Sequence, residues 1–524
     1  MKMAKKILSS LLAASMLLGT LTACGGGNSD TTESAAKSVT EAAASSGNTL
    51  TVGMMADSAG FDPAESQGSP IGMSLVYDTV VRMDVNGQLQ PCLATDWEWT
   101  DDTTVVLTIR DGVKFSNGDP LTPEDVLYTF RHFTEGSATY AADTGYDNID
   151  FDNCSVDGMK LTIKLKEPDV LFIDRMVSFR WSSVVSQKLG QMTEDEIWNS
   201  PVGTGPYTCV ENVSGSYATF KRNEDYWGDK PAAEEITIRY YAEETTMMID
   251  LETGAIDIAV GLSDNNAKRL ENGEAKGQCK IVPSGDMILF TMPEYVDVFQ
   301  DINVREAVAH ALNVEQLTKI SLGELGKPAT STVPETTKFY KNVGAYSYDP
   351  ELSKQILADA GYQDGDINLK IVYVQSDVND KMCEAAQSML KEVGINLSVE
   401  GYDFATAISY FMNGDLDFSL AEFTENCFDP AILYSFGAAE CTNACMALQD
   451  EEFNKLIREG KSTSDEAKRQ EIYGEVQDYM YNLYRWIPVA EKMVATGLGD
   501  RINADSYYAF DATCPDLRYV TFNS

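Results

Sequence analysis

The sequence predicts an α/β protein with two or three domains, on the strength of three observations. Its 524 residues exceed what one hydrophobic core usually serves. A hydrophobic content of 44% with 10% aromatic residues is typical of a globular protein. From Leu369 onward, strand-like and helix-like segments alternate and close at Gly or at a polar turn, which favours a largely parallel sheet with covering helices.

The helices and strands of this second half are marked by their ends. Asp349 and Pro350 supply an N-cap and a proline at the first helical position, and Gly361 ends that helix. A second helix stops at Gly394. The alternating elements are a strand from 369, a helix over 379–393, a strand over 395–400, a helix over 404–412 and a strand over 416–421.

In the first half, strict alternation of apolar and polar residues predicts further strands. They are expected at 104–109, 161–165, 217–221 and 236–241. Gly203 and Gly205 stand beside Pro206, and this combination predicts a tight turn with unusual backbone angles.

The N-terminus predicts an export signal at 1–23 followed by a lipid anchor. Lysines at 2, 5 and 6 precede a short apolar run at 7–18, and small residues precede Cys24. Cleavage before Cys24 would leave a thiol that can carry diacylglycerol. A plain signal peptide with a chance Cys is the alternative. Residues 24–48 comprise the lipidated Cys and a Gly-, Ser-, Thr- and Ala-rich linker that is expected to be disordered.

The chain is strongly acidic. Its formal net charge is −41, and loss of three signal lysines and no acids makes it about −44. Such a surface repels nucleic acid and anionic lipid, so no nucleic acid partner is expected. The charge favours either a solvated surface that keeps the protein in solution or a field that selects cationic solutes. No later apolar run approaches the roughly 20 residues of a spanning helix.

Cysteine and histidine usage predicts no metal site and no cofactor. Nine cysteines remain beyond Cys24, and only Cys441 and Cys445 are close enough to suggest a local disulfide. His132 and His310 are far apart in the sequence. A nucleophile elbow, a phosphate-binding loop and an H-E-x-x-H motif are all missing from the sequence. A carboxylate pair for glycoside hydrolysis stays open, so a secreted hydrolase is the alternative from another class.

Ordered motifs span nearly the whole chain. They are QPCLATDW at 90–97, LTIRDGVKF at 107–115, GDPLTPEDV at 118–126, PVGTGPY at 201–207, RNEDYWG at 222–228, NVREAVAHALN at 303–313, the segment 348–362 and WIPV at 486–489. In this order they resemble the family-5 extracellular solute-binding proteins, the peptide- and nickel-binding lipoproteins that serve ABC importers. One departure is Ser116, where relatives commonly have a His after the Phe.

Most of these motif residues are expected to have structural roles. Trp97, Tyr226 and Trp227 are predicted to be core anchors rather than platforms for a ligand. Arg110 is predicted to fix a loop through charge-assisted hydrogen bonds. The motifs therefore identify a scaffold without lining its pocket.

The resemblance implies a two-lobed periplasmic-binding-protein-like fold of type II, in the large three-subdomain cluster, with a ligand cleft between the lobes. Crossings near 283–285 and 489–492 would form the hinge of a closing motion. The expected division is lobe I at 49–69, 202–284 and 490–524, a subdomain inserted in lobe I at 70–201, and lobe II at 285–489.

The resemblance also implies two walls of a ligand site. One follows the first strand and contains Gln67, Gly68 and Ser69. The other precedes Asp429 and places the aromatic Phe423 in contact with the ligand.

The charged contacts of the dipeptide-binding branch are replaced in this chain. Asn426 stands where that branch has an Asp for the ligand amino group, and Tyr373 stands where it has an Arg for the ligand carboxylate. Glu425 or Glu422 are candidates to replace the amine contact, and a register error of one or two residues is the alternative.

The sequence therefore predicts a non-enzymatic subunit of an ABC importer that captures oligopeptides or peptide-like solutes. An oligosaccharide is the alternative ligand, and the two histidines disfavour nickel. The expected partners are ABC permease subunits and, through a lipid anchor, the cytoplasmic membrane. The protein is expected to be a monomer outside the cytoplasm, on the periplasmic side where the cell has an outer membrane.

Overall fold

The computed structural model describes residues 47–523, with gaps at 56–59, 66–69, 85–87, 136–143, 179–181, 425–428, 440, 442 and 512–513. The predicted signal peptide and Cys24 lie outside the described residues. So do five of the predicted ligand contacts, namely Gln67, Gly68, Ser69, Glu425 and Asn426. Among the helices that are described, none is long and apolar enough to cross a membrane.

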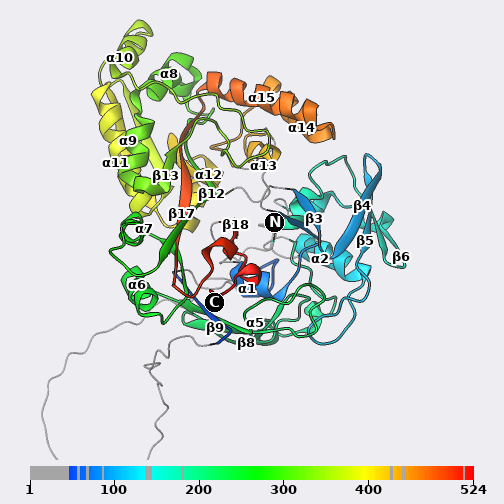
Figure 1. Ribbon diagram of the computed structural model, residues 1–524. Coiled ribbons are helices and arrows are strands. Elements are labelled where there is room, and N and C mark those ends of the chain that lie inside the picture. Colours follow the sequence, from blue (N-terminus) through cyan, green and yellow to red (C-terminus); the bar gives the residue numbers. More distant parts are fainter. Residues whose placement is uncertain are drawn as a thin grey trace, which may run out of the picture. The chain divides into compact units, whose positions relative to one another are not determined.

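The central element of the described structure is an eleven-stranded sheet (Figure 1). Its strand β13 (Gly326–Pro328) pairs with β17 beside the main path. In spatial order the other strands are β15 (Ile395–Tyr402), β14 (Ile367–Val374), β16 (Phe418–Thr424), β12 (Gln278–Thr291), β17 (Trp486–Leu498), β11 (Ile258–Leu262), β1 (Thr49–Met54), β10 (Glu235–Tyr240), β9 (Tyr217–Arg222) and β8 (Tyr207–Val213).

The predicted alternation of strands and helices after residue 366 is confirmed. Strand β14 pairs in parallel with both β15 and β16, and α11 (Asp377–Glu392) and α12 (Phe404–Asn413) connect them. This parallel part ends at β16, because β16 and β12 are antiparallel, and a second parallel part joins β10, β1 and β11. The helix predicted after residue 349 is α10 (Pro350–Asp359), and the Asp349 carboxylate caps it by accepting the Leu352 N–H at 2.9 Å.

Two long antiparallel strands, β12 and β17, contain both predicted crossings of the chain. Their register shifts between Pro283 and Met287, and Gly285 has a φ of 77° at this irregularity. A positive φ is strained for other residues, so glycine suits this position. That these strands act as a hinge stays a prediction.

A second, four-stranded antiparallel sheet lies within residues 94–164 in the order β4 (Ala94–Asp101), β5 (Thr104–Ile109), β7 (Lys160–Lys164) and β6 (Ser155–Asp157). Helix α2 (Pro123–Glu135) packs on it through Val126 and Phe130, which are buried together with Leu107 and Ile163. The four strands predicted by alternation in the first half are confirmed as β5, β7, β9 and β10.

The structure has the following further helices and strands. The helices are α1 (Ile71–Val76), α5 (Glu194–Asn199), α6 (Glu244–Thr253), α7 (Asp264–Glu271), α8 (Ile302–Ala311), α9 (Val314–Leu322), α13 (Pro430–Ser435), α14 (Glu451–Ser462) and α15 (Glu466–Leu483). The strands are β2 (Val81–Met83), β3 (Leu89–Pro91), β18 (Ala509–Asp511) and β19 (Cys514–Pro515).

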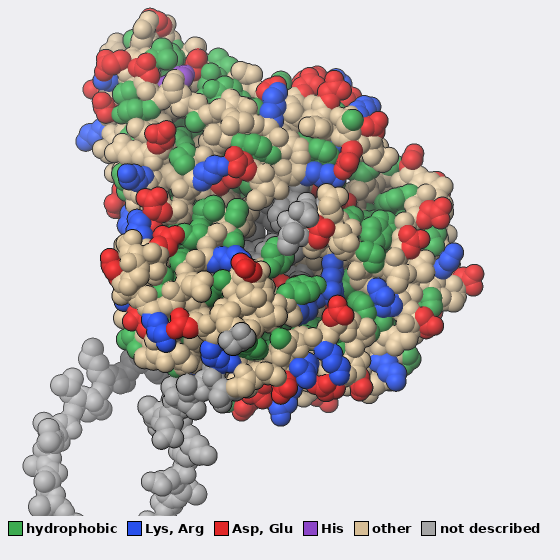
Figure 2. All heavy atoms as spheres, in the orientation of Figure 1, with side chains coloured by type: hydrophobic (Ala, Val, Ile, Leu, Met, Phe, Trp, Pro, Cys, Tyr) green, Lys and Arg blue, Asp and Glu red, His purple; other side chains and the backbone are tan. Residues whose placement is uncertain are grey.

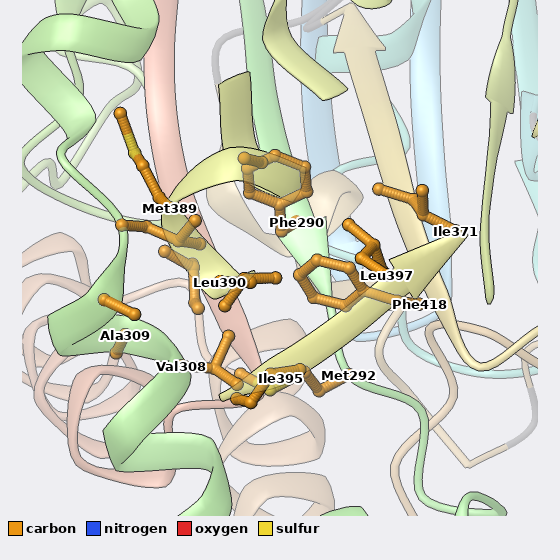
Figure 3. Packing of buried hydrophobic residues seen from close by; sticks show 14 of the residues in the cluster. Phe290, Met292, Val308, Ala309, Ile371, Met389, Leu390, Ile395, Leu397 and Phe418 are labelled. Carbon is orange, nitrogen blue, oxygen red and sulfur yellow. The ribbon is translucent and has the colours of Figure 1, made fainter. Parts of the chain in front are cut away.

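Two buried clusters cover opposite faces of the sheet around β12 and β16. One joins these strands to α8, α9, α10 and α11, and Phe290 stacks on Phe418 at its centre with ring centroids 5.0 Å apart (Figure 3). The other joins them to α12, α13, α14 and α15 and contains the fully buried Trp486 and Tyr434. In Figure 1, helices α8 to α11 accordingly lie on one side of β17.

The prediction for Gly203 and Gly205 was wrong in its reason. Neither residue is among the glycines with positive φ. Instead, a Cβ on Gly203 would lie 2.0 Å from the Val76 carbonyl oxygen, and one on Gly205 would lie 2.5 Å from the Val76 carbonyl carbon. Close approach of the backbone after α1, rather than unusual backbone angles, requires glycine at both positions.

The anchor roles predicted for Tyr226 and Trp227 are confirmed, and a buried carboxylate explains them. The Asp78 carboxylate is fully buried and accepts hydrogen bonds from the Tyr226 hydroxyl at 3.1 Å and the Trp227 indole N–H at 2.8 Å. The predicted role of Arg110 is also confirmed. Its guanidinium donates to the Cys92 carbonyl at 3.0 Å and lies 4.4 Å from the Trp227 ring centroid.

Candidate functional site

A row of side chains crosses four neighbouring strands on one face of the large sheet. Met287 in β12 lies directly opposite Phe423 in β16 on one side and Glu491 in β17 on the other. Lys327 in β13 lies opposite Glu491 and extends the row. Directly opposed residues point to the same face of a sheet. We call this face, which carries Phe423, Met287, Glu491 and Lys327, the site face.

The half-buried Phe423 is held by aromatic rings. Its ring centroid lies 5.3 Å from that of Phe436 and 6.4 Å from that of Trp486, with the latter pair nearly parallel at 15°. Trp486 in turn stacks on Tyr434 at 6.3 Å. Stacked aromatic rings bury a large apolar area and restrict one another, so Phe423 presents a fixed apolar surface.

A buried ion pair holds the helix that follows the Phe423 strand. Asp429 caps α13, and Arg469 donates to both of its carboxylate oxygens at 2.9 Å. The Arg469 guanidinium also lies over the rings of Phe339 and Tyr473, 5.2 and 5.3 Å from their centroids. A bidentate, stacked arginine has one favoured geometry, so it fixes the start of α13 relative to α15.

Glu491 is the acidic member of the site face. The residue is 7% exposed, and its Oε2 accepts a hydrogen bond from the Glu335 backbone N–H at 3.1 Å. Its Oε1 is buried and has no hydrogen-bond partner among the residues that the structure describes. Burial raises the pKa of Glu491, the Glu335 charge adds to this rise, and Lys327 opposes it. The Lys327 ammonium pairs with the Glu335 carboxylate instead.

Tyr373 and Glu422 lie on the opposite face. Tyr373 is 4% exposed, packs in the same cluster as Phe418, and donates its hydroxyl to Asp380 Oδ1 at 2.8 Å. Glu422 lies opposite Ile288 and forms an ion pair with Lys492. The structure therefore does not bring Tyr373 and Phe423 together. A ligand contact at Tyr373 stays a prediction, and it requires access from the face opposite Phe423.

A hollow of about 570 Å³ is lined by described residues of β2 and β3 and by C-terminal residues that include Asp516 and Tyr519. Two arginines line it, and each has a carboxylate partner. Arg82 donates to Asp78 Oδ1 at 2.7 Å, and Arg518 donates to Asp516 Oδ1 at 2.7 Å. Sequence reasoning singled out neither arginine. Both cations are paired, and the carboxylates of Asp84 and Asp505 also line the hollow, so its walls are polar.

The segment 165–178 reaches the cluster beneath the site face. Leu171 is fully buried in the same cluster as Met287 and Trp486, and the Val170 backbone N–H lies 3.5 Å from the Lys461 carbonyl oxygen in α14. Nearby, burial and the charge of Asp429 raise the pKa of Asp174 to about 6, while Lys338 and Arg469 oppose the rise. Segments 165–178 and 429–486 thus meet on this side of the sheet.

Histidine and cysteine side chains of the described chain are used for packing. His132 Nε2 lies 2.8 Å from Asp62 Oδ1, and His310 Nδ1 lies 2.8 Å from the Ser347 carbonyl oxygen. No cluster of three or more potential metal-ligating side chains occurs within the described ranges. The suggested disulfide at Cys445 does not form. Cys445 is a free, buried thiol that donates to the Phe411 carbonyl at 3.3 Å.

Sequence reasoning missed Glu491 and Met287. A signal for Glu491 exists, because it is an acid inside a strand that is otherwise mostly apolar from Trp486 to Leu498. Acids are rarely buried in strands unless they are paired. Met287 carries no comparable signal, since apolar residues fill both faces of β12 at this point.

Comparison with known proteins places the chain among binding proteins. A family model described as bacterial extracellular solute-binding proteins, family 5 Middle, matches residues 88–442. Heme-binding protein A of Haemophilus influenzae is 24% identical over 538 residues, which cover 96% of this chain and 97% of that protein. Di/tripeptide-binding protein 2 of Pseudomonas aeruginosa is 24% identical over 481 residues, which cover 85% of this chain and 90% of that protein.

A solved structure agrees with the fold. The ABC transporter substrate-binding protein CtaP from Listeria monocytogenes superposes with a TM-score of 0.80 at 20% identity, covering 91% of this chain and all of that one. The predicted two-lobed α/β fold is thereby confirmed. Proteins of this family bind solutes outside the cytoplasm for ABC transporters and are not enzymes, so the hydrolase alternative is set aside. The match over most of the sequence shows that this chain belongs to the family-5 bacterial extracellular solute-binding proteins.

Proposed function

We propose that this protein captures oligopeptides or peptide-like solutes and delivers them to the permease of its ABC importer. The observation that carries the proposal is the site face, where the fixed aromatic Phe423 and the carboxylate of Glu491 lie in one row. An apolar side chain and an amino group are the two features of a peptide that such a row fits. The di/tripeptide-binding relative supports the same ligand class.

A metal or heme ligand fits the chain less well. The heme-binding relative is as similar to this chain as the peptide-binding one, so similarity does not choose between their ligands. Imidazole is a common ligand of transition metals. Both histidines of this chain are hydrogen-bonded to Asp62 and Ser347, away from the site face.

In the proposed mechanism the two lobes close around the solute. Lobe I consists of 49–69, 202–284 and 490–524, lobe II consists of 285–489, and the subdomain at 70–201 belongs to lobe I. The crossings lie in β12 and β17, beside the site face. Gln67, Gly68 and Ser69 contribute one wall, and Phe423 with Glu425 and Asn426 contributes the other.

The lipid anchor at Cys24 belongs to the same proposal. The linker up to residue 48 is expected to be disordered and to take no part in solute binding, so Cys24→Ala should move the protein from membrane to soluble fractions without changing its affinity for solute. A tether raises the effective concentration of the binder at its transporter. Unaltered membrane retention of the variant would contradict the anchor.

The ligand class is tested by what the protein carries and what it binds. Native mass spectrometry of the purified protein identifies co-purified solute. Calorimetry then compares a dipeptide mixture, a pool of four- to eight-residue peptides and a panel of oligosaccharides. We expect the longer peptides to bind and to be recovered without chemical change. Binding of oligosaccharides alone would refute the peptide ligand while leaving the solute-binding role intact.

A further inference from the structure

Glu491 is a buried residue whose two carboxylate oxygens are not both hydrogen-bonded within the described structure. Only Oε2 has a partner, the Glu335 backbone N–H, while the buried Oε1 has none among the described residues. A buried carboxylate with an unfilled oxygen costs free energy, and folding alone gives no reason to keep it. The residue therefore calls for a partner that the polypeptide itself does not supply.

The charge of Lys327 compensates Glu491 only in part. Lys327 lies opposite it in β13 but pairs with Glu335, whose side chain is half-exposed. Lys492, the next residue in β17, points to the opposite face and pairs with Glu422. Glu335 adds a second negative charge near the site. The local field at Oε1 thus favours a cation.

We infer that Glu491 recognises a positively charged amino group of the bound solute, while Phe423 packs against the adjoining apolar part. This inference rests on the proposed function and names the chemistry of the same site. In a peptide the group is the α-ammonium, and a charge-assisted hydrogen bond to Oε1 would complete the coordination of the carboxylate. Glu491 thereby takes the role for which Asn426 lacks the charge.

The spacing of the row suits an extended peptide. Glu491 and Phe423 are separated by β12 alone. Neighbouring strands lie about 4.8 Å apart, so the two residues are about 10 Å apart across the sheet. An extended chain advances about 3.3 Å per residue, so an amino group at Glu491 places the third and fourth residues of the peptide near Phe423.

Access to Glu491 follows from its strand. In the structure Met287 is fully buried and Glu491 is 7% exposed. It lies within the predicted crossing at 489–492, so separation of the lobes would uncover this part of β17. Solute would then meet the carboxylate before closure, and closure would exclude water from the new ion pair, which strengthens it.

The test compares two forms of the same probe. Calorimetry measures the affinity of the wild-type protein for an equimolar pool of lysine-free tetrapeptides with free amino termini and for the same pool after N-acetylation. We expect acetylation to weaken binding about tenfold or more, as for loss of a charged hydrogen bond. Equal affinities for the two pools would overturn the inference while the peptide-binding function stands.

Variants assign the effect to Glu491. In Glu491→Gln the two pools should bind within about threefold of each other, because one uncharged amide cannot replace the ion pair. Glu491→Met should also bind the two pools with similar affinity. Because methionine suits an apolar surrounding, this variant serves as the test if the Gln variant does not fold. Glu351→Gln, which changes an exposed glutamate of α10, is the matched control and should keep the wild-type preference. Retained preference in either Glu491 variant would overturn the inference.

Failure of the proposed function gives a different result. If neither tetrapeptide pool binds the wild-type protein and a panel of oligosaccharides does, then both the peptide ligand and the recognition of its amino group are refuted. The three results are distinguishable, since the first involves unequal affinities, the second equal affinities and the third no peptide affinity.

Discussion

The two faces of the sheet at β16, β12 and β17 differ in whether their charged side chains have partners. On the opposite face, Glu422 pairs with Lys492, and Tyr373 donates to Asp380. On the site face, Arg469 and Asp429 pair beneath the surface, while Glu491 keeps one buried oxygen unfilled. Paired charges stabilise a fold or leave it unchanged, whereas an unfilled one is kept at a cost. The difference directs the search for the ligand to the site face.

The surface as a whole gives a weaker indication. In Figure 2, acidic and basic side chains are interspersed over the visible face, although the chain carries a net charge of −41. Interspersed surface charges keep a protein in solution and do not by themselves select a solute. The position of a single buried carboxylate is the more specific observation.

The largest expected effect is a difference in stability between variants that break the ion pairs of the two faces. Arg469→Ala leaves Asp429, which is almost fully buried, without its partner, and should lower the free energy of unfolding by about 3–5 kcal/mol. Glu422→Ala breaks a pair whose side chains are 27% and 37% exposed, and Lys492 keeps Asp286 as a partner at 3.8 Å, so the change should cost less than about 1 kcal/mol. Urea unfolding measures both. Equal costs would contradict the comparison.

The next effect concerns the contact between segment 165–178 and the buried cluster that contains Met287 and Trp486. Leu171 is fully buried beside residues of that cluster, so Leu171→Ala should remove about 2–3 kcal/mol of packing. Because this contact joins 165–178 to the α13–α15 side, we expect a larger radius of gyration in solution scattering and weaker solute binding.

Leu352→Ala is the control for this variant, since Leu352 is 36% exposed. It should change neither the scattering curve nor the affinity. A Leu171→Ala protein with the wild-type radius of gyration would show that the contact does not hold the two segments together.

Local signals explain why the elements were predictable. The helix at Pro350 has a capping Asp349 and a terminal Gly361, and the strand at 104–109 alternates, so short-range chemistry defines both. Gly203 and Gly205 were misread because their constraint is a contact with Val76, more than 120 positions away in the sequence. Contacts of that range leave no pattern in a single sequence.

The site was less predictable for the same reason. Phe423 was named from a resemblance, but its place beside Glu491 depends on the registers of β16, β12 and β17, which come from distant parts of the chain. A shift of one residue in a strand moves a side chain to the other face. Glu422 and Phe423, which are adjacent in sequence, accordingly face different clusters.

A pH effect tests the side of the sheet where Asp174 meets Asp429. Burial raises the pKa of Asp174 to about 6 from its usual 3.8, so the native state favours the protonated acid. The stability that this gives is fully present below the usual pKa and is lost as the pH rises through about 6. Relative to Asp174→Asn, the wild-type protein should lose on the order of 1 kcal/mol between pH 4 and pH 7. Parallel pH profiles of unfolding free energy for the two proteins would contradict this.

The smallest expected effect decides which face the solute uses. Tyr373→Phe removes a hydroxyl that donates to Asp380 at 2.8 Å in a residue that is 4% exposed, so stability should fall by about 1 kcal/mol. Solute affinity should not change, because the ring stays in the cluster opposite Phe423. Phe423→Ala is the counterpart and should weaken binding. Calorimetry with the peptide pool measures the affinity of both variants. If Tyr373→Phe loses as much affinity as Phe423→Ala, the solute also contacts the opposite face, and the distinction between the two faces of the sheet is wrong.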